Sequence, residues 1–150
     1  MAEQKKGITL ISGATGGLGR AFVIECAKEG VPLFLTGRSE EKLAALRAEL
    51  SEKFPAVRAD SFACDLADEG SRAALFSYIV QKGYIVSRLC NVAGADIQKA
   101  FERYTQEKIV FQCRVNFEAA VSLAKFALDN RAEGLEIVTV SSISGVYPMP

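Results

Sequence analysis

The chain has 150 residues, the usual size of one domain, and 49% of them are hydrophobic, so it can bury a full core. Its 18 basic residues balance its 18 acidic residues, which argues against nucleic acid as the main partner because phosphate binding rests on a basic excess. The sequence has no histidine, which excludes every mechanism with a histidine base.

The cysteines and the N-terminus bear on metals and on location. Cys26, Cys64, Cys90 and Cys113 are too far apart in sequence for clustered zinc ligands, so we expect no metal site. Scattered thiols among apolar residues are typical of a reducing compartment. The apolar run within residues 1–13 is too short and too polar for a signal peptide or a membrane span. We therefore expect a cytoplasmic protein that does not enter the membrane.

Apolar β-branched runs alternate with helical patterns along the chain. The expected strands cover residues 8–11, 31–35, 57–64, 86–90 and 135–140. The expected helices run from Leu18 to Gly30, from the N-cap Ser39 to before Pro55, over 68–81, and from about 104 to 130. Single helices between strands require crossover connections, which predict a parallel sheet with helices on both faces. No repeat or linker divides the chain, so we expect residues 1–150 to form one domain.

A glycine-rich turn, S-G-A-T-G-G-L-G over residues 12–19, joins the first expected strand to the first helix. Its spacing, G-x-x-x-G-x-G, differs from both the common dinucleotide fingerprint and the P-loop. Glycines at this position permit a tight turn and let backbone N–H groups approach a pyrophosphate, to which the helix N-terminus adds partial positive charge. The placement favours nucleotide binding over the alternative of a purely structural turn.

The second strand ends in L-T-G-R, with Gly37 at the position where an acid would accept a hydrogen bond from the ribose 2′-hydroxyl of NAD. Arg38 follows it, and a guanidinium can hold the 2′-phosphate of NADP. We therefore expect NADP(H) in preference to NAD(H); the alternative for Arg38 is a solvated surface charge.

With these features the chain resembles the short-chain dehydrogenase/reductase family, which typically carries T-G-x-x-x-G-x-G at the turn; Ser12 replaces the threonine. The family's N-N-A-G motif appears as N-V-A-G over residues 91–94, and its fifth strand resembles V-T-V-S-S-I-S-G over 138–145. The resemblance covers essentially the whole chain. It implies a Rossmann-type doubly wound sheet with strand order 3-2-1-4-5, and it leads us to expect that the C-terminal part of the fold is absent.

The resemblance also implies which residues contact the cofactor. Asp65 is expected to bind the adenine amino group with Leu66 alongside, although Asp65 could instead cap a turn. The remaining expected cofactor contacts come from the glycine turn and the N-V-A-G motif: Gly13, Thr15, Gly16, Gly17, Leu18, Gly19, Asn91, Ala93 and Gly94.

For catalysis, the resemblance implies that Ser142 orients the substrate carbonyl, with Ser141 and Ser144 as weaker alternatives. Asn116, within an apolar stretch of the long helix, would hold a water in a proton relay; the alternative is an amide bonded within the helix. The family's acid and its lysine, in Y-x-x-x-K, are expected beyond Pro150, and Tyr147 is not assigned this role. We therefore expect this chain to be inactive alone.

These observations favour an NADP(H)-dependent oxidoreductase that acts on a small carbonyl or alcohol substrate, with neither nucleic acid nor membrane as a partner. One alternative is a non-enzymatic NADP(H)-binding sensor or partner module. Another is a methyltransferase that uses S-adenosylmethionine, against which Arg38 counts because that site requires an acid for the ribose hydroxyls. The helix over 104–130 is a candidate surface for a homo-oligomer.

Overall fold

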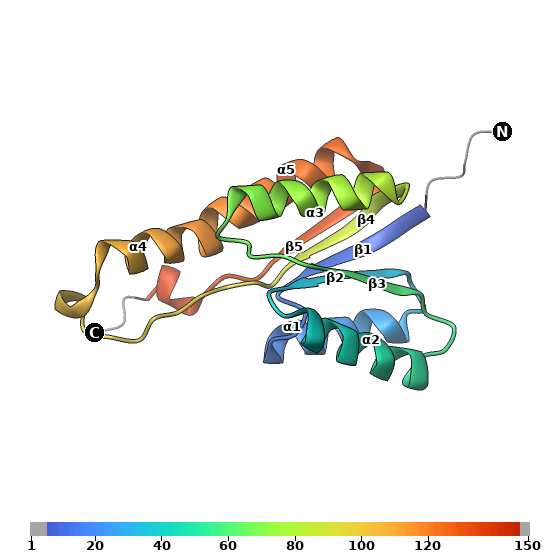
Figure 1. The fold of residues 1–150 in the computed structure, drawn as a ribbon, viewed down its shortest axis with the longest axis horizontal. Helices are drawn as coiled ribbons and strands as arrows, with labels where there is room; N and C mark the ends of the chain where they lie inside the picture. The colour runs from blue at the N-terminus through green and yellow to red at the C-terminus, as the bar shows by residue number, and fades with distance from the viewer. Residues whose placement is uncertain (1–5, 148–150) are drawn as a thin grey trace.

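The structure is a computed structural model that describes residues 6–147 (Figure 1). Its strands are β1 (Lys6–Ser12), β2 (Leu33–Gly37), β3 (Ala59–Ala63), β4 (Tyr84–Asn91) and β5 (Arg131–Thr139). Its α-helices are α1 (Gly17–Lys28), α2 (Glu40–Lys53), α3 (Glu69–Gln81), α4 (Gln106–Cys113) and α5 (Ala119–Asp129). Three further turns are the 3₁₀ segments η1 (Phe101–Arg103) and η3 (Ile143–Gly145) and the π-helical segment η2 (Arg114–Glu118).

The five strands form one sheet in the order β3-β2-β1-β4-β5, and every pairing is parallel. This confirms the predicted order. At the centre of the sheet, Ile11 of β1 pairs with Leu35 of β2 on one side and with Cys90 of β4 on the other. The strand order reverses between β1 and β4: β2 and β3 lie on one side of β1, and β4 and β5 lie on the other. The connections that leave β1 and β4 therefore diverge at the carboxyl ends of these two strands.

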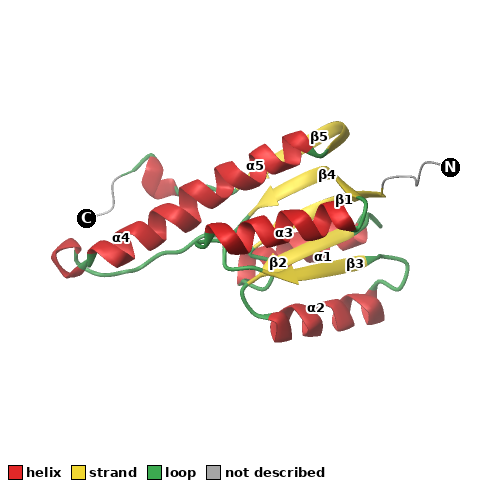
Figure 2. Ribbon diagram, turned by 45° about the horizontal axis from the view of Figure 1, so that its top comes forward, coloured by secondary structure: helices red, strands yellow, loops and turns green. Residues whose placement is uncertain are grey.

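Helices cover both faces of the sheet. Figure 1 shows α1 and α2 on one face and α3 with α5 on the other, and Figure 2 shows the same layers from a tilted view. Because successive side chains of a strand point to opposite faces, Leu10 and Ile11 belong to different cores. Leu10 lies in the cluster that includes Leu75 of α3 and Leu123 of α5, and Ile11 lies in the cluster that includes Leu43 of α2.

The helix N-termini differ in a way that matters for the site. The side chains of Ser39, Asp68 and Thr105 cap α2, α3 and α4, each accepting a hydrogen bond from a backbone N–H three residues later. The N-cap of α1 is Gly16, which has no side chain to cap the helix, and the first turn of α1 contains no acidic residue. The first backbone N–H groups of α1 therefore have no capping side chain. These groups carry the partial positive charge of a helix N-terminus.

Several predicted boundaries need correction. The third strand, expected over 57–64, covers only Ala59–Ala63. The second strand begins at Leu33 and not at Val31, because Pro32 has no N–H for the ladder. The fifth strand begins at Arg131, four residues before the predicted Leu135. The long helix predicted over 104–130 is divided into α4 and α5 by η2, which contains Asn116.

Within residues 6–147, no helix combines the length and the apolar character that a bilayer crossing requires.

Candidate functional site

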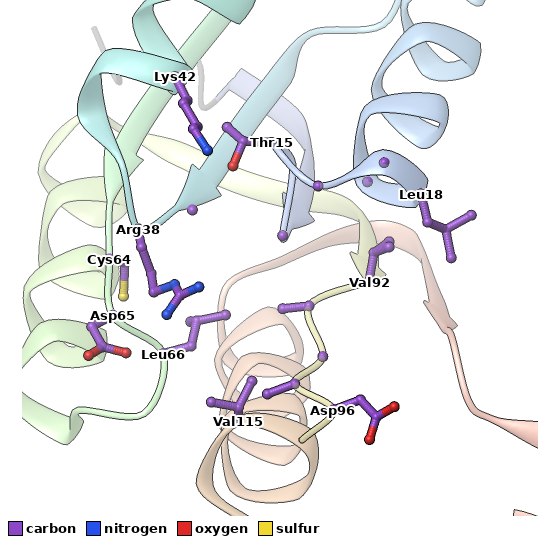
Figure 3. A pocket seen from close by; sticks show the side chains of 18 of the residues that line it. Thr15, Leu18, Arg38, Lys42, Cys64, Asp65, Leu66, Val92, Asp96 and Val115 are labelled. Atoms are coloured by element: carbon purple, nitrogen blue, oxygen red, sulfur yellow. The ribbon is translucent and has the colours of Figure 1, made fainter. Parts of the chain in front are cut away.

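A cavity of about 620 Å³ opens at the carboxyl ends of β1 to β4 (Figure 3). The glycine turn forms its middle, the segments after β2 and β3 form one end, and the loop after β4 forms the other. Every predicted cofactor residue except Asn91 lines it. The lining consists of Gly13, Thr15, Gly16, Gly17, Leu18, Gly19, Gly37, Arg38, Lys42, Cys64, Asp65, Leu66, Val92, Ala93, Gly94, Ala95, Asp96, Ile97, Phe111 and Val115.

The glycine turn brings the backbone of α1 against the end of β1. Gly13 has φ +65°, a backbone conformation that residues other than glycine rarely adopt. A β-carbon on Gly19 would lie only 2.0 Å from the carbonyl oxygen of Gly13, so position 19 also requires glycine. As a result, the uncapped N-terminus of α1 faces the cavity across a bare backbone surface.

Ser12 joins the glycine turn to the loop after β4. Its Oγ accepts hydrogen bonds from the backbone N–H groups of Val92 and Ala93, each at 3.1 Å. The two segments are in such close contact that a β-carbon on Gly13 would lie 2.8 Å from the Cα of Ala93. The serine that replaces the family's threonine therefore fixes the relative position of the middle and one end of the cavity.

Two cations lie at the end of the cavity that follows β2. Arg38 and Lys42 are both exposed, and within residues 6–147 neither side chain forms an ion pair. In Figure 3 the Lys42 amine points toward Thr15, and the Arg38 guanidinium lies on the side of the cavity that carries Asp65 and Leu66. This end of the cavity thus presents unneutralised positive charge.

The wall after β3 consists of residues 64–66, which precede α3 and contact its first turn. The N–H of Asp65 donates to Ser71 Oγ at 3.0 Å, and Asp65 Oδ1 accepts from the N–H of Ala67 at 3.0 Å. The Asp65 side chain therefore caps a local turn while also lining the cavity. Beside it, burial raises the pKa of the Cys64 thiol, so this thiol is neutral at physiological pH.

Asn116 lies beside the other end of the cavity, and the alternative of an amide bonded within its helix is wrong. It is exposed, and its amide bonds neither within its helix nor to a core residue. Its Oδ1 accepts from the N–H of Ala95 at 2.7 Å, and its Nδ2 donates to the carbonyl of Ala95 at 2.8 Å. Asn116 does not line the cavity, but it clamps a residue that does.

Asn91 and Ser142 lie away from the cavity lining. Asn91 is buried at the end of β4, and its Nδ2 donates to the carbonyl of Ala120 at 3.1 Å, so it holds the start of α5 and does not face the cavity. Ser142 is exposed just after β5, where its carbonyl accepts from the N–H of Gly145 at 3.0 Å.

The letters Y-x-x-x-K occur twice in the chain, which corrects the expectation that the pair is lacking. Tyr78 lies in α3 beside Phe34 and Phe62, with Lys82 5.2 Å from its ring centroid. Tyr104 precedes α4 and donates its hydroxyl to the carbonyl of Ile97. Both matches lie before β5 in the chain, and among residues 6–147 neither tyrosine lines the cavity.

Sequence reasoning missed several lining residues. Lys42 could have been found, because it lies four residues after Arg38 in the first turn of a helix whose cap was recognised. Asp96, Ile97 and Phe111 gave no signal, because the path of the loop after β4 places Asp96 and Ile97, and the position of α4 places Phe111.

The parallel sheet, the glycine turn and the cavity at the strand ends define a dinucleotide-binding α/β domain. Residues 7–150 match the model of the family described as short chain dehydrogenase, and the chain belongs to this family. The chain is also similar in sequence to individual members of the family, and it spans about half the length of the curated relatives it matches.

Three of these similar proteins indicate the range of the likeness. The chain is 32% identical over 145 residues to a very-long-chain 3-oxoacyl-CoA reductase-like protein of Arabidopsis thaliana, covering 91% of this chain and 45% of that protein. It is 28% identical over 147 residues to the NAD(+) 15-hydroxyprostaglandin dehydrogenase of Macaca fascicularis, covering 95% and 52%. The structure of L-sorbose reductase from Gluconobacter frateurii with NADPH and L-sorbose matches with a TM-score of 0.88 and 28% identity, covering 97% and 56%.

Proposed function

We propose that the chain is the cofactor-binding part of an NADP(H)-dependent oxidoreductase that transfers hydride between the nicotinamide and a ketone or alcohol. The observation that carries the proposal is the N-terminus of α1, which has no capping side chain and faces the cavity across the glycine turn. Uncapped N–H groups with partial positive charge suit a pyrophosphate. Helices α2, α3 and α4 lack this opening, because the side chains of Ser39, Asp68 and Thr105 cap them.

The charge distribution favours NADP(H) over NAD(H). Arg38 and Lys42 supply two cations where the 2′-phosphate would lie, and Gly37 supplies no acid for a free 2′-hydroxyl. A β-carbon on Gly37 would lie 3.1 Å from Thr15 Oγ1, so an acid at this position would also be crowded. Some similar proteins have structures with NADPH bound, such as the short-chain dehydrogenase of Sphingobium yanoikuyae. Another similar protein, the 15-hydroxyprostaglandin dehydrogenase described above, is named as an NAD(+) enzyme.

The remaining roles follow from position. Asp65, held by Ser71, would accept a hydrogen bond from the adenine amino group, with Leu66 alongside. When bound, the cofactor supplies or accepts the hydride. Ser142 would donate a hydrogen bond to the substrate oxygen, and Asn116 would act near the nicotinamide end, where it holds Ala95.

Turnover also needs a general acid, and a free tyrosine with a pKa of about 10 requires a nearby lysine to serve at neutral pH. Neither Tyr78 nor Tyr104 lines the cavity. We therefore propose that the 150-residue chain binds the cofactor without reducing carbonyls. A non-enzymatic NADP(H) sensor or partner module is the second candidate, because binding without turnover is the behaviour it would show.

The test is a titration of NADPH fluorescence with the full chain, compared with NADH. We expect NADPH to bind more tightly, and Arg38→Ala to weaken NADPH by about one to two decades while leaving NADH unchanged. Arg58→Ala, an exposed arginine outside this cavity, is the matched control. Binding of S-adenosylmethionine without binding of NADPH would contradict the proposal, and carbonyl reduction by the 150 residues would contradict the proposed lack of turnover.

The same proposal extends to partners and location. The substrate would be a small carbonyl or alcohol, and the free thiols of the described residues suit a reducing, cytoplasmic environment. The segment η2 and helix α5 expose Phe117, Val121 and Leu128 to solvent, and we propose this apolar face as the contact of a homo-oligomer.

A further inference from the structure

Arg72 lies in the first turns of α3 and is 4% exposed, yet it belongs to no predicted motif. Its guanidinium makes two contacts with different segments. Nη1 donates to the carbonyl of Leu66 at 2.6 Å, and Nη2 donates to Glu118 Oε1, an ion pair across 46 residues of sequence. A buried guanidinium needs such partners, because an unpaired charge in the interior is costly.

The first partner lines the cavity, and the second belongs to a segment that contributes to the lining. Leu66 follows β3 and forms part of the wall at the Arg38 end. Glu118 is the last residue of η2, the π segment that also contributes Val115 to the cavity and Asn116 to the clamp on Ala95. Arg72 therefore bridges one end of the cavity to the segment that shapes the other.

The bridge from Arg72 helps to hold the conformation of the π segment. A π turn is less stable than an α turn and persists where tertiary contacts hold it. Two of its side chains are fixed from outside the helix: Asn116 by Ala95, and Glu118 by Arg72. If the contact with Glu118 is lost, the segment can relax toward α-helical spacing. The direction in which Asn116 points then changes, because α and π turns place successive residues at different angles.

We infer that Arg72 is a positioning residue that couples the two ends of the cavity, by holding the Leu66 wall and the π segment of Asn116 in one fixed relation. This inference rests on the proposed function, because it assigns the two ends of the cavity to the two halves of the dinucleotide. It predicts that the contact with Glu118 affects the nicotinamide half more than the adenine half.

The experiment compares two ligands, NADPH and 2′,5′-ADP, by titration of the full chain. Glu118→Ala keeps the bond between Arg72 and Leu66, so we expect the 2′,5′-ADP Kd to stay within about twofold while the NADPH Kd rises about fivefold or more. Glu118→Gln keeps an oxygen acceptor for Arg72 and should restore most of the NADPH affinity. Arg72→Met removes both contacts and should weaken both ligands.

Two further measurements separate positioning from a general loss of structure. Arg114→Met, in the same π segment but at an exposed arginine without an ion pair among the described residues, is the matched control and should bind both ligands as wild type does. In the ligand-free chain, hydrogen exchange of the Ala95 amide should become at least about tenfold faster in Glu118→Ala, because its acceptor on Asn116 is displaced.

The outcomes are distinguishable. Equal weakening of both ligands by Glu118→Ala, or unchanged NADPH affinity with unchanged Ala95 exchange, overturns the coupling. A lower melting temperature of Arg72→Met with wild-type affinity for both ligands shows a merely structural arginine and also overturns it. If the wild-type chain binds neither ligand, the proposed function itself fails before any variant is considered.

Discussion

Thr15 and Gly37 face each other across the cavity end that follows β2: a β-carbon on Gly37 would lie 3.1 Å from Thr15 Oγ1. Contacts of this length are tighter than ordinary van der Waals packing. Thr15 therefore restricts which residue can stand at the position that distinguishes NAD from NADP in this fold.

The first prediction follows from this contact. Gly37→Asp should weaken NADPH at least about tenfold, because its carboxylate would stand beside the 2′-phosphate. It should not improve NADH binding, because the new side chain is crowded by Thr15; only the double variant with Thr15→Ala should gain NADH affinity. Competitive titration with both cofactors decides the matter, and tighter NADH binding by Gly37→Asp alone would contradict it.

Lys42 gives the second prediction. Lys42→Met should weaken NADPH about tenfold and leave NADH within about twofold, because only the 2′-phosphate needs the second cation. The dependence of the NADPH Kd on salt should also become shallower. Lys53→Met, at the opposite end of the same helix and outside the cavity, serves as the control. An equal effect on both cofactors would exclude the phosphate role.

The third prediction separates two glycines of the turn. Gly19→Ala places a β-carbon 2.0 Å from the Gly13 carbonyl oxygen, so we expect a loss of about 3 kcal/mol or more in the free energy of unfolding. Gly17→Ala meets nothing within 4 Å and should leave stability unchanged or raise it by up to about 1 kcal/mol. Denaturant unfolding of both variants measures the difference. Equal stability of the two would show that the turn is less tightly packed than the structure indicates.

The fourth prediction concerns the thiols. Burial raises the pKa of the Cys90 thiol to about 12, and Cys26 and Cys64 are also buried, whereas Cys113 is exposed. Because the thiolate is the reactive form, an aromatic disulfide reagent at pH 8 should titrate one thiol in the native chain and none in Cys113→Ser. Rapid labelling of a second native thiol would contradict the burial.

The same pKa shift fixes the sign of the response to alkali. The native state keeps the Cys90 proton up to about pH 12, whereas an unfolded cysteine loses it near pH 8.5. The unfolded state therefore binds fewer protons between these values, and the stability contribution of Cys90 falls as the pH rises. Cys90→Ala should flatten this alkaline decline in urea unfolding experiments.

The fifth prediction tests the apolar face formed by η2 and α5. Phe117 is 72% exposed, and Phe117→Glu should convert an oligomer into a monomer in sedimentation experiments, because a charge at the centre of an apolar contact disfavours association. Phe101→Glu is the matched control, since Phe101 is 77% exposed but lies in η1. A monomeric wild-type chain would exclude this face as a self-contact.

Much of the fold was predictable, because the relevant signals are local. The apolar runs marked all five strands, Ser39 marked the start of α2, and the glycine turn marked the end of β1 where the cavity opens. The strand order followed from the family resemblance, which rests on motifs spread along the whole chain. These features depend on neighbouring residues or on fixed spacings, which a sequence displays directly.

The features that escaped prediction depend on tertiary contacts. The π segment around Asn116 has no sequence period of its own, and the partner of Asn116 is a backbone 21 residues away. Arg72 looks like an ordinary charge in a helix, and only the tertiary structure shows its burial and its ion pair with Glu118. Asn91 was assigned to the cofactor because it begins the motif N-V-A-G, but its side chain bonds to the backbone of α5 and does not line the cavity.

The uncapped N-terminus of α1 would link the concentration of the cofactor to the stability of the folded protein. A ligand that satisfies the amides after Gly16 binds the native state and not the unfolded chain, so the folded population grows with the concentration of free dinucleotide. At a hundred times its Kd, such a ligand adds about 2.7 kcal/mol to the stability of the native state. The lifetime of this chain against proteases would then rise and fall with the supply of dinucleotide in its cell.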